Sequence, residues 1–489
     1  MLKTFLPLII INSEQHVTIK NNKIKHMKNR LLSLFLLLFV TVSFSQTFDV
    51  ETIKNAGDND KRINIVILGD GYTASDLTDF GTDAANFVSA IFGQSPFSEY
   101  SDYFNVHIIK VISNESGATH PGTATDEASY SVPIISVDNF FGSTYDGFGS
   151  HRLLYAPNYS LIISVLADNF PEYDQALILV NSPYYGGSGG EFPVASTGTS
   201  ADEIAIHEIG HSFVDLKDEY YPGDFYAEEG INMTQETDPS LVKWTNWVGS
   251  NGVNVYQYCT TGSCASWYRP HQTCKMRYLG YPFCAVCKEG IIEKVHDLVS
   301  PVDSFSPTNL SIETSTFPIS FNVSLINPTT SSLETTWTLN STAFATDVNM
   351  VSILEAAVND GLNNLTVAVT DNTSLQRIDS HETIHITTVT WSIDNTTLGI
   401  TDITANENRF SISLYPNPTK NAFYVKFDSF NSSNLRLELT SMDGKQVLST
   451  RLESGITNTI NLNQQAAGLY IANIYSDSVL LARKKVIKK

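Results

Sequence analysis

The residues best suited to chemistry lie in the segment SADEIAIHEIGHSFVDLKDEY, residues 200–220. His207 and His211 are four positions apart, so on a helix their side chains point to the same side. Two neutral imidazoles at this spacing can bind one Zn²⁺. Glu208 is rotated away from both rings and can reach a metal-activated water as general base without binding the metal. The pattern predicts a zinc hydrolase, and its alternative is a chance match on a helix.

A helix must carry these residues. Ser200 followed by Glu203 forms a capping-box pattern, which predicts that a helix begins there. Ile204, Ile206 and Ile209 then supply apolar faces that can pack against a core.

A catalytic zinc usually keeps three protein ligands and one open position. The apolar periodicity ends after Leu216, so we expect the chain to turn back there with a third ligand. Of two adjacent acidic residues only one should face the metal, and the other should point to solvent or cap the turn. The nearby candidates are Asp215, Asp218 and Glu219, and the distant ones are His271 and His296.

All five cysteines of the chain occur within one short stretch, so they can only cross-link one region. An odd number leaves at least one thiol free or paired elsewhere. We favour local disulfides for an exported protein, and a zinc knuckle is the alternative for two closely spaced pairs. The cysteines are Cys259, Cys264, Cys274, Cys284 and Cys287.

The segments before the motif alternate between two periodicities. Residues 63–68, 104–112 and 176–180 are apolar runs typical of strands, and residues 76–92 have helical spacing. This alternation predicts an α/β sheet layer.

The second half of the chain differs from the first in composition and residue pattern. Residues 303–400 are rich in Ser, Thr and Asn with short alternating runs, which predicts an all-β sandwich of the immunoglobulin-like kind. Residues 410–489 form another strand-and-turn series, ending in the basic run RKKVIKK. We expect this run to be a solvated tail.

Composition narrows the possible functions. The chain has 489 residues, of which 51 are acidic and 30 basic, for a net charge of −21. This length suggests about three domains. The acid excess argues against nucleic acid as a partner, because phosphate contacts require Lys and Arg.

The N-terminal region has the pattern of a targeting sequence. Residues 27–46 combine a basic start, a short apolar stretch and a small-residue exit, as in a secretory signal peptide. A membrane anchor, the alternative, needs about 20 apolar residues. Residues 1–26 then have no role, and we interpret them as an extension from a mispredicted start. We expect no stable membrane insertion.

Three motifs together resemble one peptidase family. HEIGHSFVDLKDEY is similar to the active-site signature of the IgA-type zinc metallopeptidases, family M sixty-four, within the metzincin group. NIVILGDGYTASDL at 64–77 resembles the N-terminal strand and turn of that family. CKMRYLGYPFCAVCKEG at 274–290 resembles its Met-turn segment. The resemblance implies a metzincin-like catalytic domain over residues 47–300.

The resemblance also assigns roles to single positions. It implies that His207, His211 and Asp218 bind zinc and that Glu208 is the general base. Met276 matches the methionine that packs beneath the metal. Lys217 stands where the wider metzincin pattern has its third histidine, and Asp215 stands where relatives usually carry glycine. The resemblance places Tyr278 like a tyrosine that turns toward the oxyanion, with ordinary packing as the alternative.

Two other segments have family-based expectations. The glycine-rich stretch 184–192, running into residues 192–196, is expected to supply an edge strand that pairs with extended substrate. Residues 410–489 resemble the C-terminal sorting domain of type IX secretion, on the matching pieces SLYPNPTKNAFYV, MDGKQV and LNQQAAGLYIANI. That resemblance implies the type IX machinery as a partner and export across both membranes to the cell surface or beyond.

The leading interpretation is a secreted zinc endopeptidase that hydrolyses extracellular proteins. The alternative is a surface adhesion or glycan-binding protein whose metal site is structural or vestigial. The intact His-Glu-His set argues against this alternative, because a structural zinc has no need of Glu208.

Overall fold

The computed structural model describes residues 47–127, 132–313, 316–395, 411–428, 434–441, 444–477 and 479–489. The predicted signal peptide at 27–46 and the N-terminal extension at 1–26 lie outside the described residues. Within the described part, no helix has both the length and the apolar character to span a membrane.

The first part of the chain builds a six-stranded sheet in the order β1-β3-β2-β4-β6-β5. The neighbours β3, β2, β4 and β6 are parallel, and both outer strands are antiparallel to the rest. Every residue of β2 is buried, which explains its continuous apolar run, since parallel strands are covered on both faces. The strands are β1 (Val50–Lys54), β2 (Ile63–Asp70), β3 (Phe104–Ile109), β4 (Gln175–Val180), β5 (Gly187–Ser188) and β6 (Val194–Ser196).

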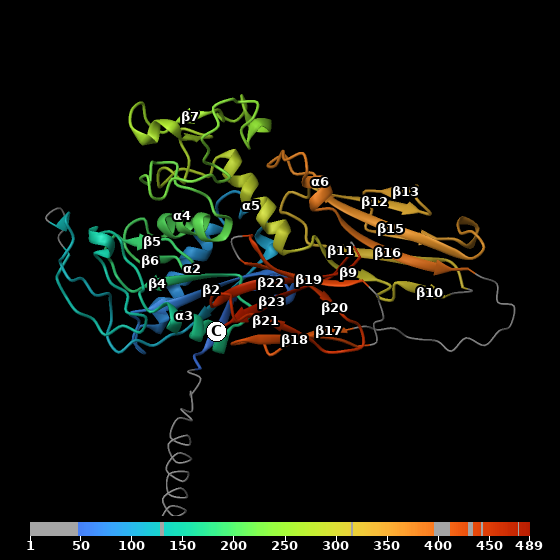
Figure 1. Ribbon diagram of the computed structural model, residues 1–489, viewed down its shortest axis with the longest axis horizontal. Helices are drawn as coiled ribbons and strands as arrows, with labels where there is room; N and C mark the ends of the chain where they lie inside the picture. Colours follow the sequence, from blue (N-terminus) through green and yellow to red (C-terminus); the bar gives the residue numbers. More distant parts are fainter. Residues whose placement is uncertain are drawn as a thin grey trace, which may run out of the picture. The chain divides into compact units, whose positions relative to one another are not determined.

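Helices cover both faces of this sheet (Figure 1). Helices α2 (Leu77–Ile91) and α4 (Ala201–Val214) pack on the face to which alternate β2 side chains such as Ile65 and Ile67 point. Helix α3 (Tyr159–Asn169) covers the opposite face, beside Val66 and Leu68. Helix α5 (Ala285–Leu298) packs against α4. The expected α/β layer is therefore present.

The glycine-rich stretch does supply an edge of the sheet, but through β5 at residues 187–188 and not through residues 192–196. Strand β6 lies between β4 and β5, so β5 is the edge. Even this edge is partly covered, because the Gly187 N–H donates to Arg152 O at 3.1 Å and Gly187 bridges to Leu153. The glycine-rich stretch is a short hairpin, which sequence alternation alone does not reveal.

The following region is entirely β apart from short helical turns such as α6 (His381–Ile384), as expected from its alternating pattern. One sheet has five strands in the order β10-β16-β15-β12-β13, and the other has three in the order β14-β11-β9. Both sheets contribute to one core, in which the rings of Trp337 and Trp391 stack 5.9 Å apart. The strands are β9 (Val302–Ser306), β10 (Ser311–Glu313), β11 (Ile319–Leu325), β12 (Leu333–Leu339), β13 (Thr342–Thr346), β14 (Met350–Ile353), β15 (Leu362–Asp371) and β16 (Thr387–Asp394).

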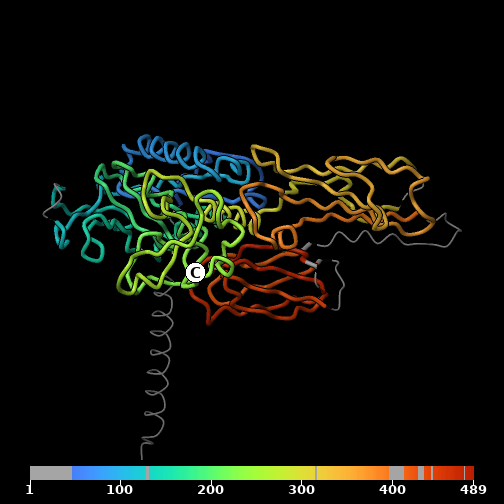
Figure 2. Tube along the Cα trace, turned by 90° about the horizontal axis from the view of Figure 1, so that it is seen from above, coloured from blue at the N-terminus to red at the C-terminus, as the bar shows by residue number. Residues whose placement is uncertain are grey.

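The last part of the chain, coloured red in Figure 2, also consists of β-strands. Sheets β17-β18-β21 and β20-β19-β22-β23 enclose a separate core. The expected solvated tail is wrong: RKKVIKK lies in β23, which pairs with β22 and buries Val486. The strands are β17 (Ser411–Tyr415), β18 (Ala422–Asp428), β19 (Leu435–Ser441), β20 (Gln446–Leu452), β21 (Asn458–Asn461), β22 (Gly468–Ser476) and β23 (Val479–Lys488).

Candidate metal centre

Helix α4 begins at Ala201, where the sequence pattern placed a helix start, but the capping box does not form. Ser200 has a left-handed backbone (φ 65°) and makes no side-chain cap hydrogen bond. Glu203 is bound instead by Lys275 Nζ, at 2.5 Å, and by the backbone N–H of Gly280, at 2.7 Å. The ammonium of Lys275 is almost fully buried and needs a counterion, so it holds the carboxylate that would have capped the helix.

The chain reverses direction immediately after α4. Asp215 ends the helix in the left-handed conformation, with φ 60° and ψ 33°, and its N–H donates to His211 O at 2.8 Å. The next residue, Leu216, is buried, and the backbone of Lys217 is held on both sides by the Asn232 amide. These contacts bring Asp218 back toward the histidines, as the end of the apolar periodicity suggested.

Three side-chain atoms converge at this reversal. His207 Nε2 and His211 Nε2 lie 3.2 Å apart. Asp218 Oδ1 lies 3.2 Å from the first nitrogen and 3.3 Å from the second. The three atoms thus form a nearly equilateral triangle, whose members come from two successive turns of α4 and from the segment after it.

The hydrogen bonds of the two rings determine which nitrogens are free. His207 Nδ1 lies 2.9 Å from Lys275 O, and His211 Nδ1 contacts Leu216 O, so each Nδ1–H is donated to a carbonyl. In the neutral rings both Nε2 atoms then present lone pairs to Asp218 Oδ1. Among the described residues this buried oxygen has no hydrogen-bond donor. Three mutually facing lone pairs repel one another, so the arrangement fits a cation.

In the metal-free chain a proton takes the place of that cation. Burial alone would lower the pKa of His211, but the carboxylates of Asp218 and Glu208 outweigh it and raise the pKa to about 9. Burial would conversely raise the pKa of Asp218, yet its contacts with His207 and His211 hold it well below the usual value. The centre therefore binds positive charge strongly.

Glu208 lies beside the triangle rather than in it. One of its carboxylate oxygens is within 4.8 Å of ring nitrogens of both histidines. The hairpin residue Gly189 leaves room for this carboxylate, since a Cβ at that position would lie 2.5 Å from Glu208 Oε2. Glu208 and His207 line one small cleft of about 170 Å³.

The cleft contains aromatic residues, of which the sequence singled out only Tyr278. This side chain is 45% exposed and its ring lies against Arg277. Tyr220 and Tyr185 line the same cleft and were missed. Burial, together with the charge of Asp218, raises the pKa of Tyr220. The sequence offered one indication that Tyr220 lies near the site: it follows Asp218 by two residues.

Met276 packs against α4 at Gly210, next to His211 in the sequence. It is fully buried, and a Cβ on Gly210 would lie 2.8 Å from its sulfur. Gly210 immediately precedes His211, so the missing side chain lets the thioether pack against the helix between the two histidines. The assignment of Met276 as a Met-turn methionine stays a prediction.

The other candidate ligands are occupied elsewhere. Asp215 pairs with Lys217 at 2.6 Å, and His296 pairs with Asp371 at 2.9 Å. His271 is half-buried and contacts Thr273 O. Glu219 was expected to face solvent or cap the turn, but it is fully buried among cysteines. Glu219 is buried by residues that are distant in the sequence. The residues next to it in the chain therefore give no basis for predicting its burial.

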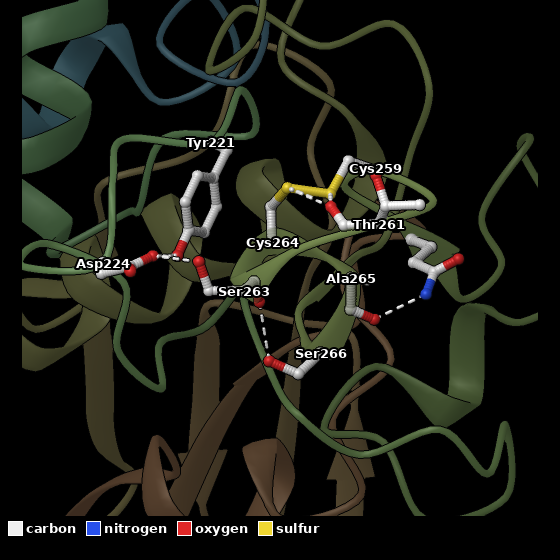
Figure 3. The surroundings of a disulfide bond; sticks show 9 residues. Tyr221, Asp224, Cys259, Thr261, Ser263, Cys264, Ala265 and Ser266 are labelled. Carbon is white, nitrogen blue, oxygen red and sulfur yellow. Dashed lines mark hydrogen bonds between the residues drawn. A yellow bond between two sulfur atoms is a disulfide. The ribbon is translucent and has the colours of Figure 1, made fainter.

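The five cysteines divide into two groups. Cys259 and Cys264 form a disulfide, as the expectation of a local bridge allowed (Figure 3). Nearby, Asp224 accepts hydrogen bonds from Tyr221 and Ser263. The remaining cysteines, Cys274, Cys284 and Cys287, are buried and not disulfide-bonded.

Two more clusters of ligand-type side chains occur away from the motif, and in both the histidines face carboxylates. His120 Nε2 lies 2.9 Å from a Glu127 oxygen, and His385 Nε2 lies 3.1 Å from a Glu293 oxygen. The clusters are His120, Glu127, Asp146 and His151, and Glu293, His381 and His385.

Comparison with protein families confirms both recognitions made from motifs. Residues 51–258 match the IgA Peptidase M64 family. Residues 413–489 match the secretion system C-terminal sorting domain. The chain therefore carries a peptidase-family domain and a type IX sorting domain, which directs it to the cell surface or the extracellular space.

Solved structures add little to this. Latent PorU from Porphyromonas gingivalis is 14% identical, with a TM-score of 0.17, over 38% of this chain and 20% of that one. Fibronectin(III)-like modules of Clostridium thermocellum CbhA are 11% identical, with a TM-score of 0.14, over 38% of this chain and 93% of theirs. Scores this low carry no argument. Comparison with curated proteins gives no significant match.

Glycine-to-alanine changes at Gly210, which lies against Met276, and at Gly81, which does not, should have opposite effects on the free energy of unfolding. Gly210→Ala should destabilise the domain by about 1–3 kcal/mol, because the new methyl group would overpack against the Met276 sulfur. Gly81→Ala, inside α2, meets nothing within 4 Å and should stabilise by about 1 kcal/mol. Urea unfolding of both variants measures the difference, and stabilisation by Gly210→Ala would contradict the packing described.

Proposed function

We propose that the protein is a secreted zinc-dependent endopeptidase that hydrolyses peptide bonds of extracellular proteins. The observation that carries this proposal is the convergence of His207, His211 and Asp218 beside the half-buried Glu208, at the wall of a cleft. The peptidase-family match over residues 51–258 and the sorting domain support it. The cleft is open to solvent, as a site for a protein substrate must be.

His207, His211 and Asp218 would hold the zinc, and their Nδ1 hydrogen bonds to Lys275 O and Leu216 O would fix the two rings in the binding orientation. When bound, zinc supplies a Lewis acid that polarises the scissile carbonyl and makes water acidic near neutral pH. Two imidazoles and one carboxylate give three ligands, which leaves one position open for catalysis.

Glu208 performs the proton transfers. Its carboxylate accepts a proton from the attacking water and then delivers it to the nitrogen of the leaving amine. Gly189 leaves the space that this carboxylate occupies. Tyr278, on the wall of the same cleft, would donate a hydrogen bond from its hydroxyl to the developing oxyanion.

No contact favours the adhesion alternative at this site. A structural zinc is normally closed by four protein ligands. The triangle has three, and we assign the neighbouring Glu208 carboxylate to the attacking water and not to the metal.

Replacing Glu208 by Gln tests the assigned base. The amide keeps the size of the side chain but cannot accept the proton, so kcat should fall by about 10²–10⁴-fold while zinc content stays at the parental level. Casein cleavage and metal analysis measure the two quantities. Asp215→Asn, on an exposed carboxylate paired with Lys217, is the matched control and should cleave like the parent. A Glu208→Gln enzyme within threefold of the parent would remove Glu208 from the mechanism.

The third ligand is tested by zinc titration of Asp218→Ala. Loss of a direct ligand should weaken zinc affinity at this centre beyond the roughly 10–100-fold typical of outer hydrogen-bond partners. Asp215→Ala, three residues earlier, should bind zinc like the parent. Parental affinity in Asp218→Ala, with loss in Asp215→Ala, would move the assignment to Asp215.

Zinc binding at this centre should release a proton. The pKa of His211 is raised to about 9 in the metal-free chain, so the ring is protonated at neutral pH, and zinc needs its lone pair. Apparent affinity should therefore rise about tenfold per pH unit between roughly pH 6.5 and 8.5. Calorimetry in two buffers of different ionisation enthalpy counts the released protons. This release should disappear in His211→Ala, and a pH-independent affinity would contradict the assignment.

A further inference from the structure

The side chains of Cys274, Cys284, Cys287 and Glu219 meet in a fully enclosed pocket of the fold. Three of the four are 0% exposed and Cys284 is 6% exposed. Their ligand atoms all lie within 4.8 Å of one another. Three thiols that are not disulfide-bonded are unusual in an exported protein, because the exterior of the cell is oxidising.

The spacing of these atoms does not suit a disulfide. Cys287 Sγ lies 3.7 Å from Cys274 Sγ and 3.6 Å from Cys284 Sγ. A disulfide would need about 2.05 Å. Tetrahedral zinc, with Zn–S of about 2.3 Å, separates two sulfur ligands by about 3.8 Å. The two observed separations are close to the tetrahedral value.

The carboxylate occupies the fourth corner. Glu219 Oε1 lies 3.4 Å from Cys287 Sγ and 3.7 Å from Cys284 Sγ. A sulfur and an oxygen ligand of one tetrahedral zinc lie about 3.6 Å apart. Glu219 Oε2 is buried and, among the described residues, has no hydrogen-bond partner. Apart from the cysteine sulfurs, the donor to Oε1 among the described residues is Asn232 Nδ2, at 3.2 Å. A fully buried carboxylate with a single amide donor and no cation is costly, so the group points to a missing positive ligand.

We propose that Cys274, Cys284, Cys287 and Glu219 bind a second zinc ion, which is structural. Four protein ligands would close its coordination, so no position is left for substrate. Thiolate ligands select zinc over calcium or magnesium. Cys284 caps the N-terminus of α5 and Cys287 lies in its first turn, where the helix dipole favours anionic sulfur. This site does not depend on the proposed peptidase activity.

The second zinc would tie together the segments that position the first. Glu219 directly follows Asp218, and its N–H donates to Met276 O at 2.7 Å. Cys274 directly precedes Lys275, whose carbonyl orients His207. The Cys284 N–H donates to Cys274 Sγ at 3.3 Å, which joins this turn to α5. One ion would thus fix the reversal after α4, the turn at Met276 and the start of α5.

Cobalt substitution of the full exported chain tests the site. Cobalt bound by thiolates gives a sulfur-to-metal charge-transfer absorption, which a centre of two imidazoles and a carboxylate cannot give. The parent should show this absorption, and His211→Ala should keep it at full intensity. The Cys259→Ser/Cys264→Ser double variant, which removes only the partly exposed disulfide, is the matched control and should also keep it. Failure of the proposed peptidase centre would leave this result unchanged.

Thiol counting on the unmodified protein guards against variants that do not fold. Native protein prepared without chelator should expose no reactive thiol, and blocking its thiols with a mercurial should release one zinc per chain. After denaturation in chelator three thiols should react. A single reactive thiol would mean a second disulfide, and three thiols without metal or charge-transfer absorption would mean an empty pocket; either result overturns the proposal. Glu219→Gln should weaken zinc affinity here by more than about 100-fold.

Discussion

The architecture around α4 depends on one electrostatic constraint: when both rings are neutral, three lone-pair atoms face one another, and among the described residues no other donor lies between them. His207 Nε2, His211 Nε2 and Asp218 Oδ1 are 3.2–3.3 Å apart. Such a group is unfavourable without positive charge, so the fold must hold it in place. Two backbone carbonyls do this by engaging the opposite ring nitrogens. The carbonyl of Lys275 belongs to the cysteine-rich turn, so the triangle is only as rigid as that turn.

The turn is secured in two ways. Lys275 buries its ammonium against Glu203, which connects it to the first turn of α4. Cys274 contacts Cys284 and Cys287, which connects it to α5. A buried charge pair such as this one is directional, but loss of either partner destabilises the fold because an unpaired charge stays buried. A closed cluster of ligands adds a second, independent restraint, so that both ends of α4 are tied to the same short segment.

The sequence predicted the parts of this centre that depend on local periodicity. The spacing of His207 and His211, the start of α4 and the buried strand β2 all follow from residues within a few positions. What it could not predict depends on distant partners. The sequence predicted that Glu203 caps the helix, but its carboxylate binds the ammonium of a lysine 72 positions later. Glu219 looked solvent-facing because no local pattern records that Cys284 and Cys287 pack over it. Likewise, no local pattern showed that β5 folds back along β6 and so becomes the edge of the sheet.

The close approach of Met276 to Gly210 gives the centre an uneven stiffness. The histidine rings are held from the side by directional hydrogen bonds, which resist rotation. The helix that carries them packs at Gly210 against an unbranched thioether, a deformable and polarizable group that fills irregular space without directional demands. A small shift of this turn of α4 against Met276 therefore costs less than rotating the rings away from their carbonyl partners. The turn can adjust in position while the two rings keep their orientation.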